Sequence, residues 1–470
     1  MKTCLKLTAT LLILAAVSTG CSTPPGFNPE VAGHGVTLPT SWSAPEVHGS
    51  AASSHDAWWR DLGDSQLNAL IEEALRNSHD VRMALANLEA ARAYAKAAGA
   101  DLYPSVNLQG DATRSKSRST TSSSPSRPQH ARLVANASWE IDFWGKARQA
   151  QEAALADANK SFWAMKAVRL SLVGSIARQY IGWLSARQSL SAAENSLKAM
   201  EQTLDIVQTK ARLGTTTPVD VELARSDMAA QIAAVASIKL SIDEHEHALA
   251  LLAANPGLKL NAPENGLMAC PKVRPGIPSE LLQNRPDVRE AEAALRNEHA
   301  LVGVAYAAFF PSISLTGQAG TQSQTLGNLF GGSIWSLGAS LDLPLFDFGR
   351  RTAQYERAQA NEKAALEAYR RAAEAAYSDV RDALSSNEAL ETIEKSRESA
   401  LASAQLAFRR ADDRYRLGAD SFLALLAAQR TMDSATQSLI SAQTERLYNF
   451  VTLNEALGAG FFEEKNPAQP

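Results

Sequence analysis

Cysteine is scarce in this sequence, with three residues among 470, at positions 4, 21 and 270. Residues 1–20 run from basic to apolar to small side chains, which predicts a secretory signal peptide too short to span a bilayer as a helix. Cys21 follows the small residues directly, as in a lipobox, although Ser18 stands where leucine is usual. We therefore expect lipidation at Cys21, the alternative being an ordinary signal peptide with an incidental cysteine. Cys270 is then left without a partner, so no disulfide framework is expected.

The chain also lacks an excess of either charge and any long hydrophobic run. Without the signal peptide it has 44 basic and 50 acidic residues, a net charge of −6. This balance excludes the basic footprint of a nucleic-acid-binding protein. No stretch after residue 20 approaches the ~20 apolar residues of a membrane helix. If the chain crosses a membrane, it must do so with strands.

Glycine and proline are missing from residues 351–417, and residues 146–213 contain only Gly174 and Gly182. Alanine, glutamate, arginine, leucine and glutamine prevail in both stretches, which favours helix. At a rise of ~1.5 Å per residue, each helix would be roughly 100 Å long. Such a helix needs partners along its whole length, so these stretches predict a coiled-coil-like assembly.

The two halves of the chain are similar to each other. Residues 75–82 match residues 282–289 at five of eight positions, and later matches pair residues 143–146 with 347–350. These collinear matches predict a tandem duplication. The predicted segments are a signal peptide at 1–20, a lipid-anchored extended segment at 21–56, repeat 1 at 57–260, a linker at 261–277, repeat 2 at 278–462 and a C-terminal tail at 463–470.

Each half contains two segments in which apolar and polar residues alternate. We expect strands at about 104–114 and 132–143 in repeat 1, and at about 311–320 and 333–345 in repeat 2. A half-buried strand of a soluble sandwich would alternate in the same way. In a membrane, the apolar face would contact lipid and the polar face would line an aqueous lumen. The residues expected toward lipid are Trp139, Ile141, Phe143, Trp335, Leu337 and Leu341.

Four strands cannot form a closed barrel in lipid by themselves, because an open sheet leaves unpaired backbone groups at its edges. Bacterial barrels begin at about eight strands. Two chains would supply eight strands and three chains would supply twelve.

A tight turn is expected at the far end of each long helix. The same three residue types recur in both halves, as Arg212, Leu213 and Gly214 and as Arg416, Leu417 and Gly418. Glycine there suits a left-handed helix C-terminus. After the first turn, Thr217, Pro218 and Asp220 indicate the capped start of a second helix. Glycine alone would explain a turn; the recurrence of arginine and leucine favours a docking surface.

Taken in order, these motifs resemble the TolC-like outer-membrane factors of tripartite efflux systems, in the lipoprotein branch that works with resistance-nodulation-division pumps. The resemblance covers nearly everything from Cys21 to Gly460. It rests on the two turns above, on the early motifs 58–61 and 64–67, on the helix-to-strand pairs 103–104 and 310–311, and on the motifs 142–145 and 347–350.

The resemblance implies a mixed, mainly α fold with a membrane β-barrel. It implies a homotrimer in which a 12-stranded barrel is continued by a 12-helix tunnel, with two tandem repeats per chain. The implied protein is an outer-membrane channel, lipid-anchored and extending into the periplasm, and not an enzyme. Its implied partners are a periplasmic adaptor protein, which docks at the two turns, an inner-membrane resistance-nodulation-division pump and outer-membrane lipid. No cofactor or metal is implied.

The family's gate pattern is absent from this sequence. Relatives often carry aspartate six or nine residues after the second turn's glycine, where this chain has Ala424 and Ala427. Neighbouring residues are the possible substitutes: Asp412, Asp413, Tyr415 and Asp420.

No catalytic constellation is found in the sequence. His245, Glu246 and His247 lack the spacing of a zincin motif, and we expect a solvated polar face there. Trp58 and Trp59 are expected to anchor the N-terminal segment, a ligand-stacking pair being the alternative. Two other functions stay open: a duct for type I protein secretion, and a non-transporting periplasmic coiled-coil lipoprotein. The exported substrates and the matching pump are not indicated.

Overall fold

The computed structural model describes residues 57–114, 129–261, 266–271 and 284–458. The predicted signal peptide, Cys21 and the C-terminal tail lie outside the described residues. None of the described helices is both long and apolar enough to cross a membrane.

The two halves share the order helix, strand, strand, long helix, shorter helix. The first half contains η1 (Trp58–Leu62), α3 (Ser65–Asn77), α4 (His79–Ala100), β1 (Ser105–Arg114), β2 (Gln129–Ile141), α5 (Lys146–Arg212) and α6 (Pro218–Leu252). The second contains α8 (Pro286–Ala307), β3 (Ser312–Ser323), η3 (Leu326–Gly331), β4 (Ser333–Asp342), α9 (Arg350–Arg416) and α10 (Phe422–Ala456). Helices α5 and α9 both have 67 residues, α6 and α10 both have 35, and α4 and α8 both have 22. These equal lengths support the interpretation as a tandem duplication.

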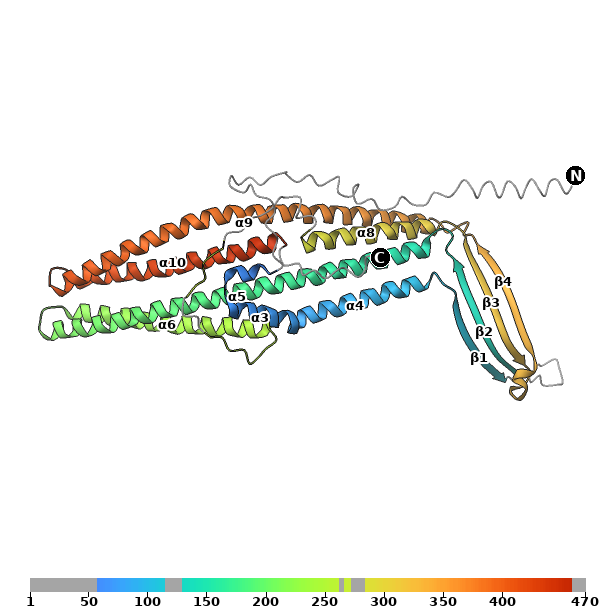
Figure 1. Ribbon diagram of the computed structural model, residues 1–470, viewed down its shortest axis with the longest axis horizontal. Coiled ribbons are helices and arrows are strands. Elements are labelled where there is room, and N and C mark those ends of the chain that lie inside the picture. Colours follow the sequence, from blue (N-terminus) through green and yellow to red (C-terminus); the bar gives the residue numbers. More distant parts are fainter. Residues whose placement is uncertain (1–56, 115–128, 262–265, 272–283, 459–470) are drawn as a thin grey trace.

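The helices form a long rod with the sheet at one end (Figure 1). Helices α5 and α9 run along the rod, and α6 and α10 fold back along their far parts (Figure 1). Helices α4 and α8 lie along the near parts and lead into the strands. The α5–α6 and α9–α10 turns are therefore at the end of the rod opposite the sheet. We call these turns tip 1 (residues 210–220) and tip 2 (residues 414–424).

The four strands form one antiparallel sheet in the order β1-β2-β3-β4. Its register pairs Trp139 with Leu315 and pairs Gly317 with Leu337. Because side chains alternate between faces, this register places most large apolar side chains of the four strands on one face, Val134 and Ile334 being on the other. The members of this apolar face are Val106, Leu108, Ala135, Ala137, Trp139, Ile141, Ile313, Leu315, Trp335, Leu337 and Leu341. Strands β1 and β4 form the edges, and neither has a second partner strand among the described residues.

Phe143, which was expected to extend this face, lies outside the strand. Strand β2 ends at Ile141, because the next side chain turns back to cap α5. The carboxylate of Asp142 accepts hydrogen bonds from the backbone N–H groups of Ala147 and Arg148, both at 3.0 Å. Phe143 is therefore part of the strand-to-helix turn.

The largest hydrophobic core lies midway along the rod, where η1 and α3 pack on α5 and α10. Trp58 and Trp59 are each 1% exposed, and the ring of Trp58 meets that of Phe450 at 5.8 Å. The carboxylate of Asp64 caps α3 and also accepts a hydrogen bond from the Tyr180 hydroxyl at 2.9 Å. The two tryptophans thus hold η1 against the helices, while the segment at 21–56 that they were expected to anchor lies outside the described residues.

Helix α5 continues through both of its glycines. A Cβ atom at Gly182 would lie 2.6 Å from Cε1 of His245 on α6 and 2.9 Å from the hydroxyl of Tyr448 on α10. A Cβ atom at Gly174 would overlap the carboxylate of Glu455. These glycines therefore allow close approach of neighbouring helices and do not break α5.

Candidate functional site: the helical tips

Both tips close with the same backbone geometry. Gly214 and Gly418 have φ angles of 71° and 75°, in the left-handed region that the sequence predicts for them. The N–H of Thr215 donates to the carbonyl of Lys210 at 2.9 Å, and the N–H of Ala419 donates to the carbonyl of Arg414 at 2.8 Å. These bonds close each turn within its own backbone, so the turn itself does not require the side chains of Leu213 and Leu417.

The helices that follow the turns are capped by side chains. Thr217 and Asp220 form a reciprocal capping box at the start of α6. A hydrogen bond from the Thr216 hydroxyl, at 2.6 Å, holds the pKa of Asp220 below its ordinary value. At tip 2 the Ser421 hydroxyl accepts from the N–H of Ala424 at 3.3 Å. The caps fix the direction in which each second helix leaves its tip.

Each tip exposes a pair of apolar side chains. Leu213 and Leu417 are 73% and 84% exposed. Val219 and Leu423, in the first turns of the following helices, are 65% and 63% exposed. Sequence reasoning singled out the two leucines and missed Val219 and Leu423, although the offset of 204 residues that relates the tips also relates this second pair. Such exposed apolar groups at the end of a rod are typical of a docking surface.

The two tips differ in charge. At tip 2, Arg416 pairs with Asp412 at 2.9 Å and Arg414 pairs with Asp420 at 2.8 Å. At tip 1, Gln208 stands at the position equivalent to Asp412, and the Arg212 guanidinium donates to the Thr209 hydroxyl at 3.0 Å. Tip 1 therefore presents a cation that no carboxylate of the described residues neutralises, whereas the arginines of tip 2 are already paired.

The possible gate residues do not form one cluster. Tyr415 is buried between the two helical hairpins, where its ring contacts Phe422. The Lys210 ammonium lies 3.8 Å from the centre of that ring and donates to the Tyr415 carbonyl at 2.9 Å. Burial, and secondarily the charge of Asp220, raises the pKa of the Tyr415 hydroxyl. Asp413 is exposed, and Asp412 and Asp420 are held by arginines.

A polar seam continues between the hairpins above the Tyr415–Lys210 contact. Arg430 of α10 donates to Asp227 of α6 at 2.6 Å, and the Ser196 hydroxyl of α5 donates to Asp433 of α10 at 2.8 Å. Burial raises the pKa of Asp433, the Ser196 hydrogen bond lowers it in part, and the charge of Asp227 raises it further. Near the tips the hairpins are therefore joined by these charged and polar contacts and by a buried apolar cluster. That cluster contains Val207, Ala224, Tyr415, Phe422, Leu425 and Leu426.

Replacing Asp433 by asparagine should stabilise the protein at neutral pH. The pKa of Asp433 is raised in the folded state, so its protonated form contributes to stability. This contribution is complete below the pKa of the unfolded state and is lost as pH rises through the pKa of the folded state. At pH 7 the ionised, partly buried carboxylate is a cost, so Asp433→Asn should raise the melting temperature by about 1–3 °C. The gain should disappear on acidification through the Asp433 pKa. Thermal unfolding at several pH values measures both effects, with the exposed Asp243→Asn as control; a lower melting temperature at pH 7 would contradict the assignment.

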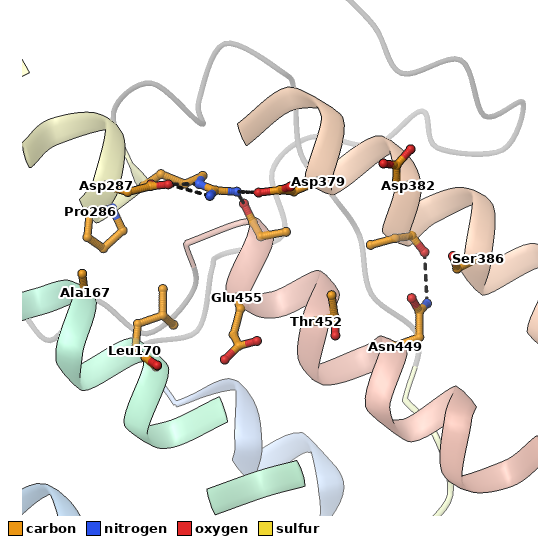
Figure 2. Close-up of a pocket in the computed structure, with 14 residues that line it drawn as sticks. Ala167, Leu170, Pro286, Asp287, Asp379, Asp382, Ser386, Asn449, Thr452 and Glu455 are labelled. Atoms are coloured by element: carbon orange, nitrogen blue, oxygen red, sulfur yellow. Dashed lines mark hydrogen bonds and ion pairs between the residues drawn. The ribbon is translucent and has the colours of Figure 1, made fainter. Parts of the chain in front are cut away.

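A cavity of about 480 Å³ lies where α10 ends and α8 begins, beside α5 and α9. Arg285 connects the start of α8 and the end of α10 to α9, and Figure 2 shows its partners Asp287 and Asp379 close together. Its guanidinium donates to Asp287 at 3.0 Å, to Asp379 at 2.9 Å and to the Ala456 carbonyl at 3.2 Å. Glu455, on the same cavity, is held by Arg178 at 3.0 Å. Since these charged groups hold one another, the cavity is a structural joint between the helices.

The prediction of a solvated polar face at residues 245–247 is only partly correct. His247 is exposed, but His245 and Glu246 are half-buried against α5. Nδ1 of His245 lies 2.8 Å from the side-chain oxygen of Gln179, and Glu246 accepts from the Trp183 indole at 2.9 Å. Burial lowers the pKa of His245. Among the described residues, no three histidine, cysteine or acidic side chains are grouped so that they could hold a metal ion.

Comparison with known proteins shows which family the chain matches. Residues 70–255 and 277–459 match the model of the family described as outer membrane efflux protein. The chain is 32% identical to the pyoverdine export outer membrane protein OpmQ of Pseudomonas putida, covering 96% of this chain and 97% of the relative. It is 30% identical to the probable efflux pump outer membrane protein TtgC of the same species, covering 97% and 96%. The crystal structure of the Neisseria gonorrhoeae MtrE outer membrane channel, in its open state, superposes with a TM-score of 0.80 at 30% identity, covering 90% of this chain and 96% of that one.

Proposed function

The chain belongs to the outer membrane efflux protein family, and from this premise we propose how it acts as the outer-membrane channel of a tripartite efflux pump. It is located in the outer membrane, extends into the periplasm and is a passive exit duct for small molecules.

We propose that three copies close into one duct. The observation that carries this proposal is the sheet at the end of the long helical rod. Most of its large apolar side chains are on one face, and its two edge strands have no second partner strand in the described part of the chain. An open edge is costly in lipid, so β4 of one copy would pair with β1 of the next. Three chains give twelve strands and a helical tunnel beyond them. The opposite face, with Asn107, Asn136, Gln318 and Ser336 in register, would line an aqueous lumen.

The tips are the proposed docking site for a periplasmic adaptor protein, which links the duct to an inner-membrane resistance-nodulation-division pump. Arg212, Leu213 and Gly214 at tip 1 and Arg416, Leu417 and Gly418 at tip 2 are the proposed contacts, together with Val219 and Leu423. Each trimer would present these groups six times around its end. Tip 1 offers an available cation and tip 2 a mainly apolar contact, so the two tips suit different parts of the adaptor.

The gate is proposed to work through the seam between the hairpins. Ala424 and Ala427 cannot form an acidic ring, so closure would depend on how the α9–α10 hairpin sits against α5 and α6. The Tyr415–Lys210 contact and the Asp227–Arg430 pair are the links that must change when that hairpin moves. Asp413 and Asp420 are the remaining acidic candidates near the opening.

An acyl chain on Cys21 is the proposed lipid anchor. Two or three acyl chains on one residue meet or exceed the two anchoring groups that stable membrane attachment needs. The anchor would fasten the N-terminal segment to the membrane, and the buried Trp58 and Trp59 would fasten it to the helices.

Native mass spectrometry of the full chain extracted in mild detergent tests the duct directly. The expected result is a species of three chains, each carrying lipid mass at Cys21. In a separate experiment, the same chain should restore drug efflux in cells that lack their own channel. A stable monomer as the only species would contradict the closed duct. A mature chain beginning elsewhere than Cys21 without lipid would contradict the anchor alone.

A further inference from the structure

An aromatic contact joins the two repeats at the boundary between sheet and helices. Trp144, in the turn between β2 and α5, stacks on Phe310, in the turn between α8 and β3. The ring centres are 4.7 Å apart and the planes are inclined by 19°. The Trp144 indole also donates to the Pro311 carbonyl at 2.7 Å. This contact closes the seam between repeat 1 and repeat 2 within one chain.

The duplication places a second pair of aromatic residues at the equivalent positions. Phe348 precedes Gly349 as Trp144 precedes Gly145, and Tyr103 precedes Pro104 as Phe310 precedes Pro311. Neither of the second pair is covered by its own chain: Phe348 is fully exposed and Tyr103 is 71% exposed. Phe348 also has a φ of 53°, which is unfavourable for a residue with a side chain. A strained and fully exposed aromatic residue is a feature that a contact should compensate.

The helices beside these aromatic residues differ in the same way between the two repeats. Helix α8 packs between α5 and α9, whereas α4 packs against α5 and has no comparable packing against α9 of the same chain. The free side of α4 exposes large side chains, among them Met83 at 61% and Tyr94 at 65%. An α9 helix from another copy would stand against α4 as α5 stands against α8.

Phe348 and Tyr103 cannot meet within one chain. They adjoin β4 and β1, the two edges of the sheet, which are about 14 Å apart at the usual strand spacing. We propose that Phe348 of one copy stacks on Tyr103 of the next copy, repeating between chains the contact that Trp144 and Phe310 make within the chain. The proposal rests on the closed trimer proposed above and adds which residues seal the seam between its copies.

Cross-linking of paired cysteines tests this contact in the intact protein. In a Cys270→Ser background, Tyr103→Cys combined with Phe348→Cys should give covalently linked dimers and trimers in outer membranes treated with a mild oxidant or a short bifunctional thiol reagent. Each single-cysteine variant should remain unlinked. Tyr103→Cys with Phe330→Cys is the matched control, because Phe330 is 79% exposed but lies in η3 at the other end of the sheet.

Removal of the ring provides a second readout. Phe348→Ala should lower the temperature at which the oligomer dissociates by several degrees, whereas Phe330→Ala should leave it unchanged. A three-chain oligomer without a 103–348 link, in which Phe348→Ala behaves like the parent, would overturn the contact and leave the duct intact. The contact is equally overturned if Phe348→Ala weakens membrane association but not the oligomer, since the ring then serves lipid. A monomer in native mass spectrometry would overturn the duct and the contact together.

Discussion

Replacing Leu213 and Leu417 together by aspartate is expected to abolish efflux and adaptor binding while the oligomer reaches the outer membrane in normal amount. Both side chains are largely exposed in the free chain, so the double substitution should not affect folding. In a docked interface it would bury unpaired charges at a cost of several kcal/mol. Since about 1.4 kcal/mol corresponds to a tenfold change, adaptor affinity should fall by about a hundredfold or more. Drug accumulation in cells and co-purification of the adaptor measure the two effects.

Methionine at both positions is the matched control, because it keeps the apolar surface and should support efflux like the parent. The arginines add a comparison between the tips. Arg212→Ala should weaken adaptor binding more than Arg416→Ala, because the Arg416 guanidinium is already held by Asp412. A double aspartate variant that pumps and binds adaptor normally would show that the tips are not the docking site.

Most of the fold follows from two features of the sequence. The absence of helix breakers between residues 351 and 417 predicted α9, which runs from Arg350 to Arg416. The alternation of apolar and polar residues predicted where strands lie and which residues share a face. The strand ends were less well predicted: β2 ends at Ile141 and β4 at Asp342, where about 143 and 345 were expected. At β2, a capping hydrogen bond to Asp142 competes with strand pairing, and alternation does not reveal such competition.

The tips could be predicted in part because their residues are close in sequence. Gly214 and Gly418 end helices by local backbone geometry. Val219 and Leu423 could have been found from the offset of 204 residues that relates the two tips. The Lys210–Tyr415 contact could not be predicted from the sequence, since the two residues are 205 positions apart and meet only when the hairpins pack. Packing also accounts for His245 and Glu246, whose polar side chains suggested a solvated face but serve as partners for α5.

The exposed apolar face of the sheet, likewise, cannot be explained by the single chain. In a single chain, Leu337 is 81% exposed, and nothing in the chain itself explains an apolar side chain so open to its surroundings. A membrane does explain it, because lipid is the medium in which that face would be satisfied. The face can therefore be tested by a charge placed on either side of the strand.

Arginine at position 337 is expected to prevent insertion, whereas arginine at the adjacent position 336 should be tolerated. Leu337 is near the middle of β4 on the apolar face, and Ser336 points to the opposite face, paired with Gln318. A charge at the bilayer midplane costs about 2–4 kcal/mol per copy on the lipid side of a barrel, and a trimer would incur it three times. Leu337→Arg should therefore reduce the oligomer in outer-membrane fractions by at least tenfold, while Ser336→Arg forms oligomers in normal amount and alters only the passage of charged solutes. Because the two substitutions add the same charge one residue apart, general damage to the strand would affect both equally. Equal loss in both variants, or normal insertion of Leu337→Arg, would contradict a lipid-facing sheet.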